Sequence, residues 1–317
     1  MNLYDVAIVG GGPAGLNAAV VLGRCQRKII LFDTGKPRNV RSKGIHNYLT
    51  RDHIAPLDFL HIAHEEIKKY GIKFHYLKVI NAVKNEEGIF KITDRRHQVY
   101  YSKKLLLATG LSDILPRIKG FSACYGKTVF HCPYCDGWEI RNKKIGVYAK
   151  NKNGFELAVS LKTWSSQVSL FTDGKKYLKA TQVQVLADLD IPVFTKPLQQ
   201  LKHEDGNLKK IIFADNTYEP CDALFFVNGY DQQASLAENL GCVFTDKGVV
   251  MTDKTQGTKV KGLFVAGDAS KDMHFVVVAA SEGAKAGVVI NKELQKENVE
   301  ILLKSKRAIE PLKKRVR

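Results

Sequence analysis

Long hydrophobic runs are absent from this sequence of 317 residues. Its apolar stretches, such as residues 105–108 and 275–280, are far shorter than the ~20 residues that cross a bilayer, so the sequence excludes a membrane-spanning helix. The N-terminus has no basic segment ahead of an apolar core and no cleavage site made of small residues. This pattern predicts a cytoplasmic protein.

Acidic residues are few relative to basic ones. The chain has 32 Asp and Glu against 49 Lys and Arg, a formal net charge of +17. This charge favours acidic partners such as nucleic acid, an anionic membrane or an acidic redox protein, and it is equally compatible with a surface that only confers solubility. The 44% hydrophobic content indicates a globular protein, and the length favours two domains.

Cysteine is also sparse for a chain of this length, which excludes a secreted scaffold held by disulfides. The six cysteines are Cys25, Cys124, Cys132, Cys135, Cys221 and Cys242. Two of them form a C-x-x-C motif, but the sequence has no second C-x-x-C and no H-x-x-x-H that could complete a zinc site. We therefore expect no metal and interpret the close pair as a redox centre, with an inert buried pair as the alternative.

The first 33 residues follow a βαβ pattern. An apolar strand at 6–9 precedes glycines and a helix over about 13–24, and a second strand at 28–32 ends in Asp33. Strands alternating with helices predict an α/β fold with a doubly wound sheet.

Further elements follow in a similar order, which indicates a weak internal duplication. We expect helices at 56–70, 154–164 and 275–296, strands at 72–77, 105–108, 145–148, 168–171, 224–227 and 263–266, and meanders of short strands at 80–101 and 198–218. In the first meander the strands lie at 80–83, 89–93 and 98–101. The basic C-terminal residues are expected at the periphery, with Pro311 breaking any helix there.

The glycines after the first strand form a dinucleotide fingerprint. The sequence from Gly10 to Gly15 gives G-x-G-x-x-G between a strand and a helix. Gly10 permits the tight turn, Gly12 lets the backbone approach a pyrophosphate, and Gly15 lets helix and strand pack closely. The helix N-terminus then holds the phosphates, and Asp33 accepts a hydrogen bond from a ribose hydroxyl.

Two later segments resemble those of flavoproteins with two dinucleotide-binding domains. They are the A-T-G ending at Gly110 and the G-x-x-x-A-G-D ending at Asp268. The resemblance implies FAD, with Asp268 on the ribityl chain and the following helix, near Phe275, directed at the flavin. The residues expected to bind FAD are Gly10, Gly12, Pro13, Ala14, Gly15, Asp33, Thr109, Gly110, Gly267, Asp268 and Phe275.

The redox motif reads H-C-P-Y-C-D-G-W from His131. Here the chain resembles the low-molecular-weight thioredoxin reductase family, class II FAD-dependent pyridine nucleotide-disulfide oxidoreductases, over residues 1 to about 296. The resemblance implies two Rossmann-like domains in a three-layer ββα architecture. It also implies that Cys135 faces the flavin, that Cys132 exchanges with the substrate disulfide, and that Asp136 donates protons. Independently of the resemblance, a carboxyl group beside the sulfurs suits proton delivery, although Asp136 could instead cap a helix and His131 could be a base or a turn residue.

The chain departs from this family where a second G-x-G-x-x-A should bind the nicotinamide cofactor. The glycine positions fall on Ala149, Asn151 and Gly154, and Asp173 stands where the family places basic residues for a 2′-phosphate. Side chains that could still bind phosphate are Lys150, Lys152, Lys175 and Lys176. Three electron donors therefore stay open: NADPH, NADH, and a donor that is no pyridine nucleotide, such as ferredoxin or another acidic protein.

The resemblance suggests how domains and partners are organised. We expect an FAD domain at 1–117 and 245–300, a domain with the redox cysteines at 118–244, a basic tail at 301–317, and hinges near 116–120 and 241–248. The implied substrate is a thioredoxin-like protein or a small disulfide, and the implied assembly is a homodimer. A dithiol oxidase that uses oxygen and a nucleic-acid-binding flavoprotein are the competing hypotheses.

Overall fold

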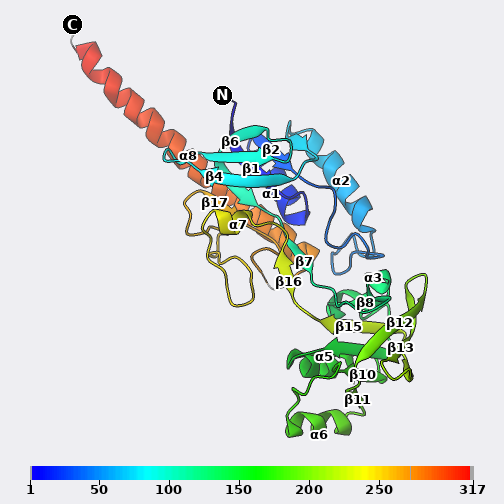
Figure 1. Ribbon diagram of the computed structural model, residues 1–317. Coiled ribbons are helices and arrows are strands. Elements are labelled where there is room, and N and C mark those ends of the chain that lie inside the picture. The colour runs from blue at the N-terminus through cyan, green and yellow to red at the C-terminus, as the bar shows by residue number, and fades with distance from the viewer. Residues whose placement is uncertain (1, 272, 315–317) are drawn as a thin grey trace. The chain divides into compact units, whose positions relative to one another are not determined.

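The computed structural model describes residues 2–271 and 273–314, with side chains as far as residue 305. Its contacts divide the chain into two compact units, drawn in Figure 1. The first comprises Met1–Pro37, Asp58–Leu111 and Gln232–Arg317, and the second comprises Arg38–Leu57 and Ser112–Asp231. None of the helices in the described part of the chain has the length and apolar character that spanning a membrane requires.

A mostly parallel sheet forms the centre of the first unit. Its strands follow the order β3 (Lys73–His75), β2 (Ile29–Phe32), β1 (Leu3–Val9), β6 (Val99–Leu107), β5 (Phe90–Asp94) and β4 (Val79–Lys84), and β17 (Leu263–Val265) also pairs with β6. The pairs of β1, β2, β3 and β17 are parallel, and the pairs β4–β5 and β5–β6 are antiparallel.

The two faces of this sheet carry separate hydrophobic cores. Because side chains alternate along a strand, Val6 and Ile8 pack with α1 (Pro13–Arg24), α2 (Pro56–Lys68) and α8 (Val276–Lys314), whereas Ala7 and Val9 pack with the meander and α7 (Leu236–Asn239). α1 and α8 lie side by side against the sheet (Figure 1). The predicted α/β class is confirmed.

Strand β6 corrects one expectation. The sequence suggested separate strands at 98–101 and 105–108, whereas β6 is one continuous strand. β5 pairs with its first half and β17 with its second, on the same edge. Of the two lysines between the predicted strands, Lys104 is buried, and its ammonium contacts Glu293 at 2.6 Å and Glu297 at 2.7 Å, both on α8. These ion pairs offset the cost of burying the charge, which the local sequence does not reveal.

Helix α8 corrects a second expectation. It was predicted to end near residue 296, with a break at Pro311, but it continues to Lys314, as Figure 1 shows. A proline removes one backbone hydrogen bond and disfavours helix, yet the lysines, leucines and glutamate around it are good helix formers. Most side chains of the basic tail at 301–317 lie outside the described residues, so the tail's role stays a prediction.

The second unit repeats the doubly wound pattern, as the sequence suggested. Its parallel sheet has the order β11 (Val193–Phe194), β10 (Val168–Phe171), β9 (Ile145–Ala149), β15 (Ala223–Val227) and β8 (Val129–Phe130). Helices α5 (Asn153–Leu161) and α6 (Ala180–Asp188) connect successive strands, and α3 (Phe121–Cys124) and α4 (Pro133–Asp136) flank β8. An antiparallel sheet of β12 (Leu198–Glu204), β13 (Asn207–Phe213) and β14 (Tyr218–Pro220) precedes β15.

The chain passes between the units through two paired strands. These are β7 (Leu111–Asp113) and β16 (Tyr230–Gln232), and the units change at Leu111/Ser112 and Asp231/Gln232. The predicted domain boundaries, after residues 117 and 244, lie further along the chain. Those boundaries, and the hinges expected near them, stay predictions.

The contact between α1 and α8 gives the first testable prediction. A Cβ added to Gly283 of α8 would lie 1.9 Å from the backbone oxygen of Ala14 on α1, so Gly283→Ala must push the helices apart. We expect a loss of roughly 1–3 kcal/mol of stability, measured as a lower melting temperature of the protein. Ser281→Ala, at an exposed position on the same helix, is the matched control. Equal melting temperatures of the two variants would contradict the close packing.

Candidate functional site

The turn between β1 and α1 is built from close backbone contacts. Gly10 has φ +109°, and a Cβ there would lie 2.1 Å from the Ala108 oxygen. A Cβ on Gly15 would lie 1.9 Å from the Gly10 oxygen. By contrast, a Cβ on Gly12 would meet nothing within 4 Å, and Gly12 caps α1 without a side-chain hydrogen bond. The start of α1 is therefore open, as a phosphate site requires.

The predicted cofactor residues meet at one edge of the first sheet. Because β2, β1, β6 and β17 are parallel neighbours, the segments after them lie together at their carboxyl ends. These segments carry, in the same order, Asp33, the glycine turn, Thr109–Gly110 and Gly267–Asp268. Gly110 and Gly267 have φ of +68° and +79°, conformations that favour glycine. The edge is the place where such folds bind dinucleotides.

The start of α8 completes this edge and includes a residue that the sequence analysis missed. Phe275 immediately precedes α8, and its carbonyl accepts a hydrogen bond from Ala279. On the first turns of α8, Glu282 accepts a hydrogen bond from the Gly267 backbone N–H at 2.8 Å. Burial raises the pKa of this carboxyl group. Glu282 thus fixes the turn before Asp268, a contact that spans 15 residues and leaves no local motif.

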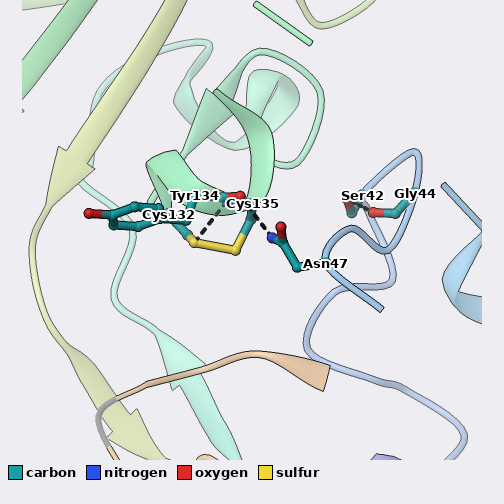
Figure 2. Close-up of a disulfide and its surroundings, with 6 residues drawn as sticks. All are labelled: Ser42, Gly44, Asn47, Cys132, Tyr134 and Cys135. Atoms are coloured by element: carbon teal, nitrogen blue, oxygen red, sulfur yellow. Dashed lines mark hydrogen bonds between the residues drawn. A yellow bond between two sulfur atoms is a disulfide. The ribbon is translucent and has the colours of Figure 1, made fainter. Parts of the chain in front are cut away.

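The redox motif follows β8 in the second unit. Cys132 and Cys135 form a disulfide across the short helix α4, shown in Figure 2. Pro133 occupies the first turn, and the Cys132 sulfur accepts a hydrogen bond from the Cys135 backbone N–H at 3.1 Å. A sulfur in this position is one that a helix N-terminus stabilises as a thiolate.

Asp136 lies directly after the disulfide. Burial, with the charge of Glu139 as a second cause, raises the pKa of Asp136 to about 7. A carboxyl group with this pKa holds and releases protons near neutral pH, which is the property of a general acid. Glu139, three residues on, was not among the predicted site residues.

A loop from the segment 38–57 holds the redox helix. The Asn47 side-chain amide donates to the Tyr134 carbonyl oxygen at 2.8 Å (Figure 2). The neighbouring His46 lies 3.7 Å from Glu139 and 3.8 Å from Asp52. Sequence reasoning found none of these residues, because the segment lies about 90 residues away from the motif along the chain.

An ion pair anchors the same segment beside β7. Arg38 contacts Asp113 at 2.5 Å, and Tyr125 also donates to this carboxylate. Burial raises the pKa of Asp113, but the hydrogen bond from Arg38 and the nearby His131 outweigh it and hold the value at about 2. His131 also packs edge-on against Phe226. Whether it acts as a base stays a prediction.

One group of possible metal ligands occurs among the described residues. His46, His53 and Glu139 place one ligand atom each within 4.8 Å of one another. His53 and Glu139 are exposed, and the group does not include the two cysteines. We interpret it as the polar contact that docks this loop beside α4.

The degenerate second fingerprint lies between β9 and α5. Ala149 ends β9, Asn151 lies in the loop, and Gly154 is in the first turn of α5. Asp173, after β10, pairs with Lys150 at 2.6 Å. These three residues therefore lie in the turn between a strand and a helix, where the sequence placed the second fingerprint.

Comparison with known proteins gives a consistent result. A family profile described as pyridine nucleotide-disulphide oxidoreductase matches residues 4–283. Thioredoxin reductase of Helicobacter pylori is 29% identical over 92% of this chain and 99% of its own length. Thioredoxin reductase sirT of Leptosphaeria maculans is 27% identical, with 92% and 94% covered. The crystal structure of TrxB from Bacillus anthracis, assigned as a thioredoxin reductase, is 32% identical, covers 93% and 99%, and has a TM-score of 0.89.

The raised pKa of Asp136 predicts a pH-dependent stability. Between the usual value of 3.8 and about 7, the folded state retains a proton that the unfolded chain releases, so stability falls as pH rises through this window. Asp136→Asn removes the cost of burying the carboxylate. Near pH 4 we expect the variant and wild type to melt at the same temperature. At pH 7–8 the variant should melt at a higher temperature than wild type, because its free energy of unfolding is larger by up to about 4 kcal/mol.

The control for this titration is Asp246→Asn, at an exposed position. Its melting temperature should follow wild type at every pH. A constant offset between Asp136→Asn and wild type from pH 4 to pH 8 would show that Asp136 has an ordinary pKa.

Proposed function

Because this chain belongs to the pyridine nucleotide-disulphide oxidoreductase family, we propose that it transfers electrons between FAD and the Cys132–Cys135 disulfide. It is a flavin-dependent oxidoreductase of the thioredoxin reductase type, which acts on disulfides. The observation that carries the proposal is the disulfide itself, held at the start of a short helix with Asp136 directly beside it.

The first unit fits FAD. The open space at Gly12 and the uncapped start of α1 suit a pyrophosphate, and Asp33 suits a ribose hydroxyl. When bound, FAD supplies a carrier that takes up and releases two electrons. In this proposal Pro13, Ala14 and Gly15 form the phosphate-binding turn of α1. Thr109, Gly110, Gly267 and Asp268 line the flavin end of the sheet edge, where the α8 N-terminus near Phe275 favours negative charge.

The two cysteines have separate roles in the proposed reaction. Cys132, as a thiolate, attacks the disulfide of the substrate, and one substrate sulfur leaves while a mixed disulfide forms. Cys135 then attacks Cys132, which releases the second substrate sulfur and restores the Cys132–Cys135 disulfide. Asp136 would give a proton to the first leaving sulfur, and the proton of the Cys135 thiol would go to the second. Bound FAD, once reduced, would supply the two electrons that break the restored disulfide. The Cys135 backbone N–H, which donates to the Cys132 sulfur, supports the attacking thiolate.

The surroundings of the disulfide support a protein or small-molecule substrate with its own disulfide. Tyr134, between the two cysteines, is 66% exposed, and Trp138, three residues after Cys135, is 65% exposed. Exposed aromatic side chains of this size are favoured at protein contacts. We therefore propose a thioredoxin-like protein or a small disulfide as the substrate.

The assembly and the location belong to the same proposal. A homodimer is the state implied by the resemblance to thioredoxin reductases, and the proposed location is the cytoplasm. Sedimentation of the flavin-loaded protein tests the first of these, since a mass of twice 35.4 kDa is expected.

Anaerobic titration with dithionite tests the electron path. FAD and the disulfide each accept two electrons, so wild type should consume twice as much dithionite as Cys132→Ser or Cys135→Ser. Both variants should lose disulfide reduction at least ~100-fold, while their flavin is still bleached. Cys242→Ser, a change at a free and half-buried cysteine, should behave as wild type.

Two results would contradict the proposal. Equal dithionite consumption by wild type and both variants would show that the disulfide does not exchange electrons with the flavin. Full disulfide reduction by Cys132→Ser would show that another group meets the substrate.

A further inference from the structure

The second nucleotide-type unit can be compared with the first position by position, because both have a strand, a turn and a helix in the same order. In the first unit, the start of α1 has no side-chain cap. In the second, the Asn151 side-chain oxygen accepts a hydrogen bond from the Asn153 backbone N–H at 3.1 Å, at the first residue of α5. Asn151 thus occupies with its own oxygen the place where a phosphate oxygen would bind.

The glycine that remains in this turn is covered by a tyrosine. A Cβ on Gly154 would lie 2.5 Å from the Tyr177 hydroxyl oxygen and 2.6 Å from Ala149 Cβ. The Tyr177 hydroxyl is buried and has no hydrogen-bond partner among the described residues. Burial raises the pKa of Tyr177 to about 12, so the group stays neutral. In the first unit the corresponding glycine, Gly15, packs against backbone, since a Cβ there would lie 1.9 Å from the Gly10 oxygen, so the second unit differs in placing a polar side chain at this position.

The strand end that would hold the ribose is also occupied. Asp173 accepts hydrogen bonds from the Tyr148 hydroxyl at 3.0 Å and the Leu198 backbone N–H at 2.7 Å, and pairs with Lys150 at 2.6 Å. Although burial raises the pKa of Asp173, these donors outweigh it and hold the carboxyl group ionised. A carboxylate that is already saturated offers little to a ribose hydroxyl, and its charge repels a 2′-phosphate. Lys150, the nearest cation, is held by this carboxylate.

These observations do not fit the nicotinamide nucleotide that the family implies. We infer that the second unit binds neither NADPH nor NADH, and that the two electrons that reduce the flavin come from a donor without a nicotinamide. The part of the inference that concerns the electron donor rests on the proposed function, because only a flavin enzyme needs such a donor. The closed turn itself is a property of the second unit alone.

Calorimetric titration with NADPH and NADH tests the closure without any turnover. Michaelis constants of enzymes are typically ~1 μM–1 mM, so a functional nucleotide site should be detectable below about 1 mM. We expect no binding heat up to about 1 mM of either nucleotide. As the matched control, protein stripped of flavin and titrated with FAD should bind one equivalent, which shows that the first unit is open. Saturable binding of either nucleotide below 1 mM would overturn the inference.

Anaerobic flavin reduction gives the second measurement. Neither nucleotide should bleach the flavin at more than about one-hundredth of the rate seen with dithionite. Rapid bleaching by NADPH or NADH would overturn the inference even if the binding heat were small. A protein that fails to bind FAD would contradict the proposed function, and the titration with nicotinamide nucleotides would still decide the closure.

The variant Tyr177→Phe distinguishes two roles of the Tyr177 hydroxyl, which either fills the turn or binds a phosphate. If the hydroxyl only fills space, the variant should melt at the same temperature as wild type or about 2–4 °C higher, because a buried unpaired polar group is removed. It should still bind no nucleotide. A lower melting temperature, or a change in nucleotide affinity, would show that the hydroxyl makes a stabilising hydrogen bond and does not only fill the turn.

Discussion

The first unit depends on close packing between backbone segments around the turn that joins β1 to α1. Gly10 touches the strand end at Ala108, Gly15 touches Gly10, and Gly283 of α8 touches α1 at Ala14. Any side chain at these places would separate β1, β6, α1 and α8. Because they stay in contact, the carboxyl ends of four parallel strands and the start of α8 converge at one edge, where the flavin site is proposed.

In the redox site, burial raises the pKa of each of two carboxyl groups, and nearby hydrogen-bond donors and positive charges lower that of Asp113. Asp113 is buried beside Arg38 and Tyr125, so it stays ionised and structural. Desolvation and the like charge of Glu139 raise the pKa of the partly buried Asp136 to about 7, so this carboxyl group takes up a proton near neutral pH. Two carboxyl groups of one unit thereby have pKa values of about 2 and about 7. Environments that separate pKa values in this way are typical of acid–base chemistry.

The sequence predicted what is local and failed where distant segments meet. Helix α1 was predicted at its observed bounds, because a glycine turn, Pro13 and an amphipathic run mark them. The continuity of β6 was missed because Lys104 is neutralised by Glu293 and Glu297, almost 200 residues away. Of the candidate site, the glycines, the cysteines and Asp136 could be read from motifs. Asn47 could not, because its hydrogen bond goes to the backbone of Tyr134, 87 residues away. Glu282 could not, because its hydrogen bond to the Gly267 backbone belongs to no known local motif.

The second unit shows why a nucleotide fold persists after its turn has closed. The disulfide lies directly after β8, a strand of two residues at the edge of the sheet that is held by pairing with β15. β15 in turn pairs with β9, the strand that leads into the closed turn. This sheet thus supplies the fixed base of α4 and its cysteines, and its strand pairs do not depend on a bound phosphate. The scaffold of the redox pair is therefore compatible with a turn that Asn151, Tyr177 and the Lys150–Asp173 pair fill.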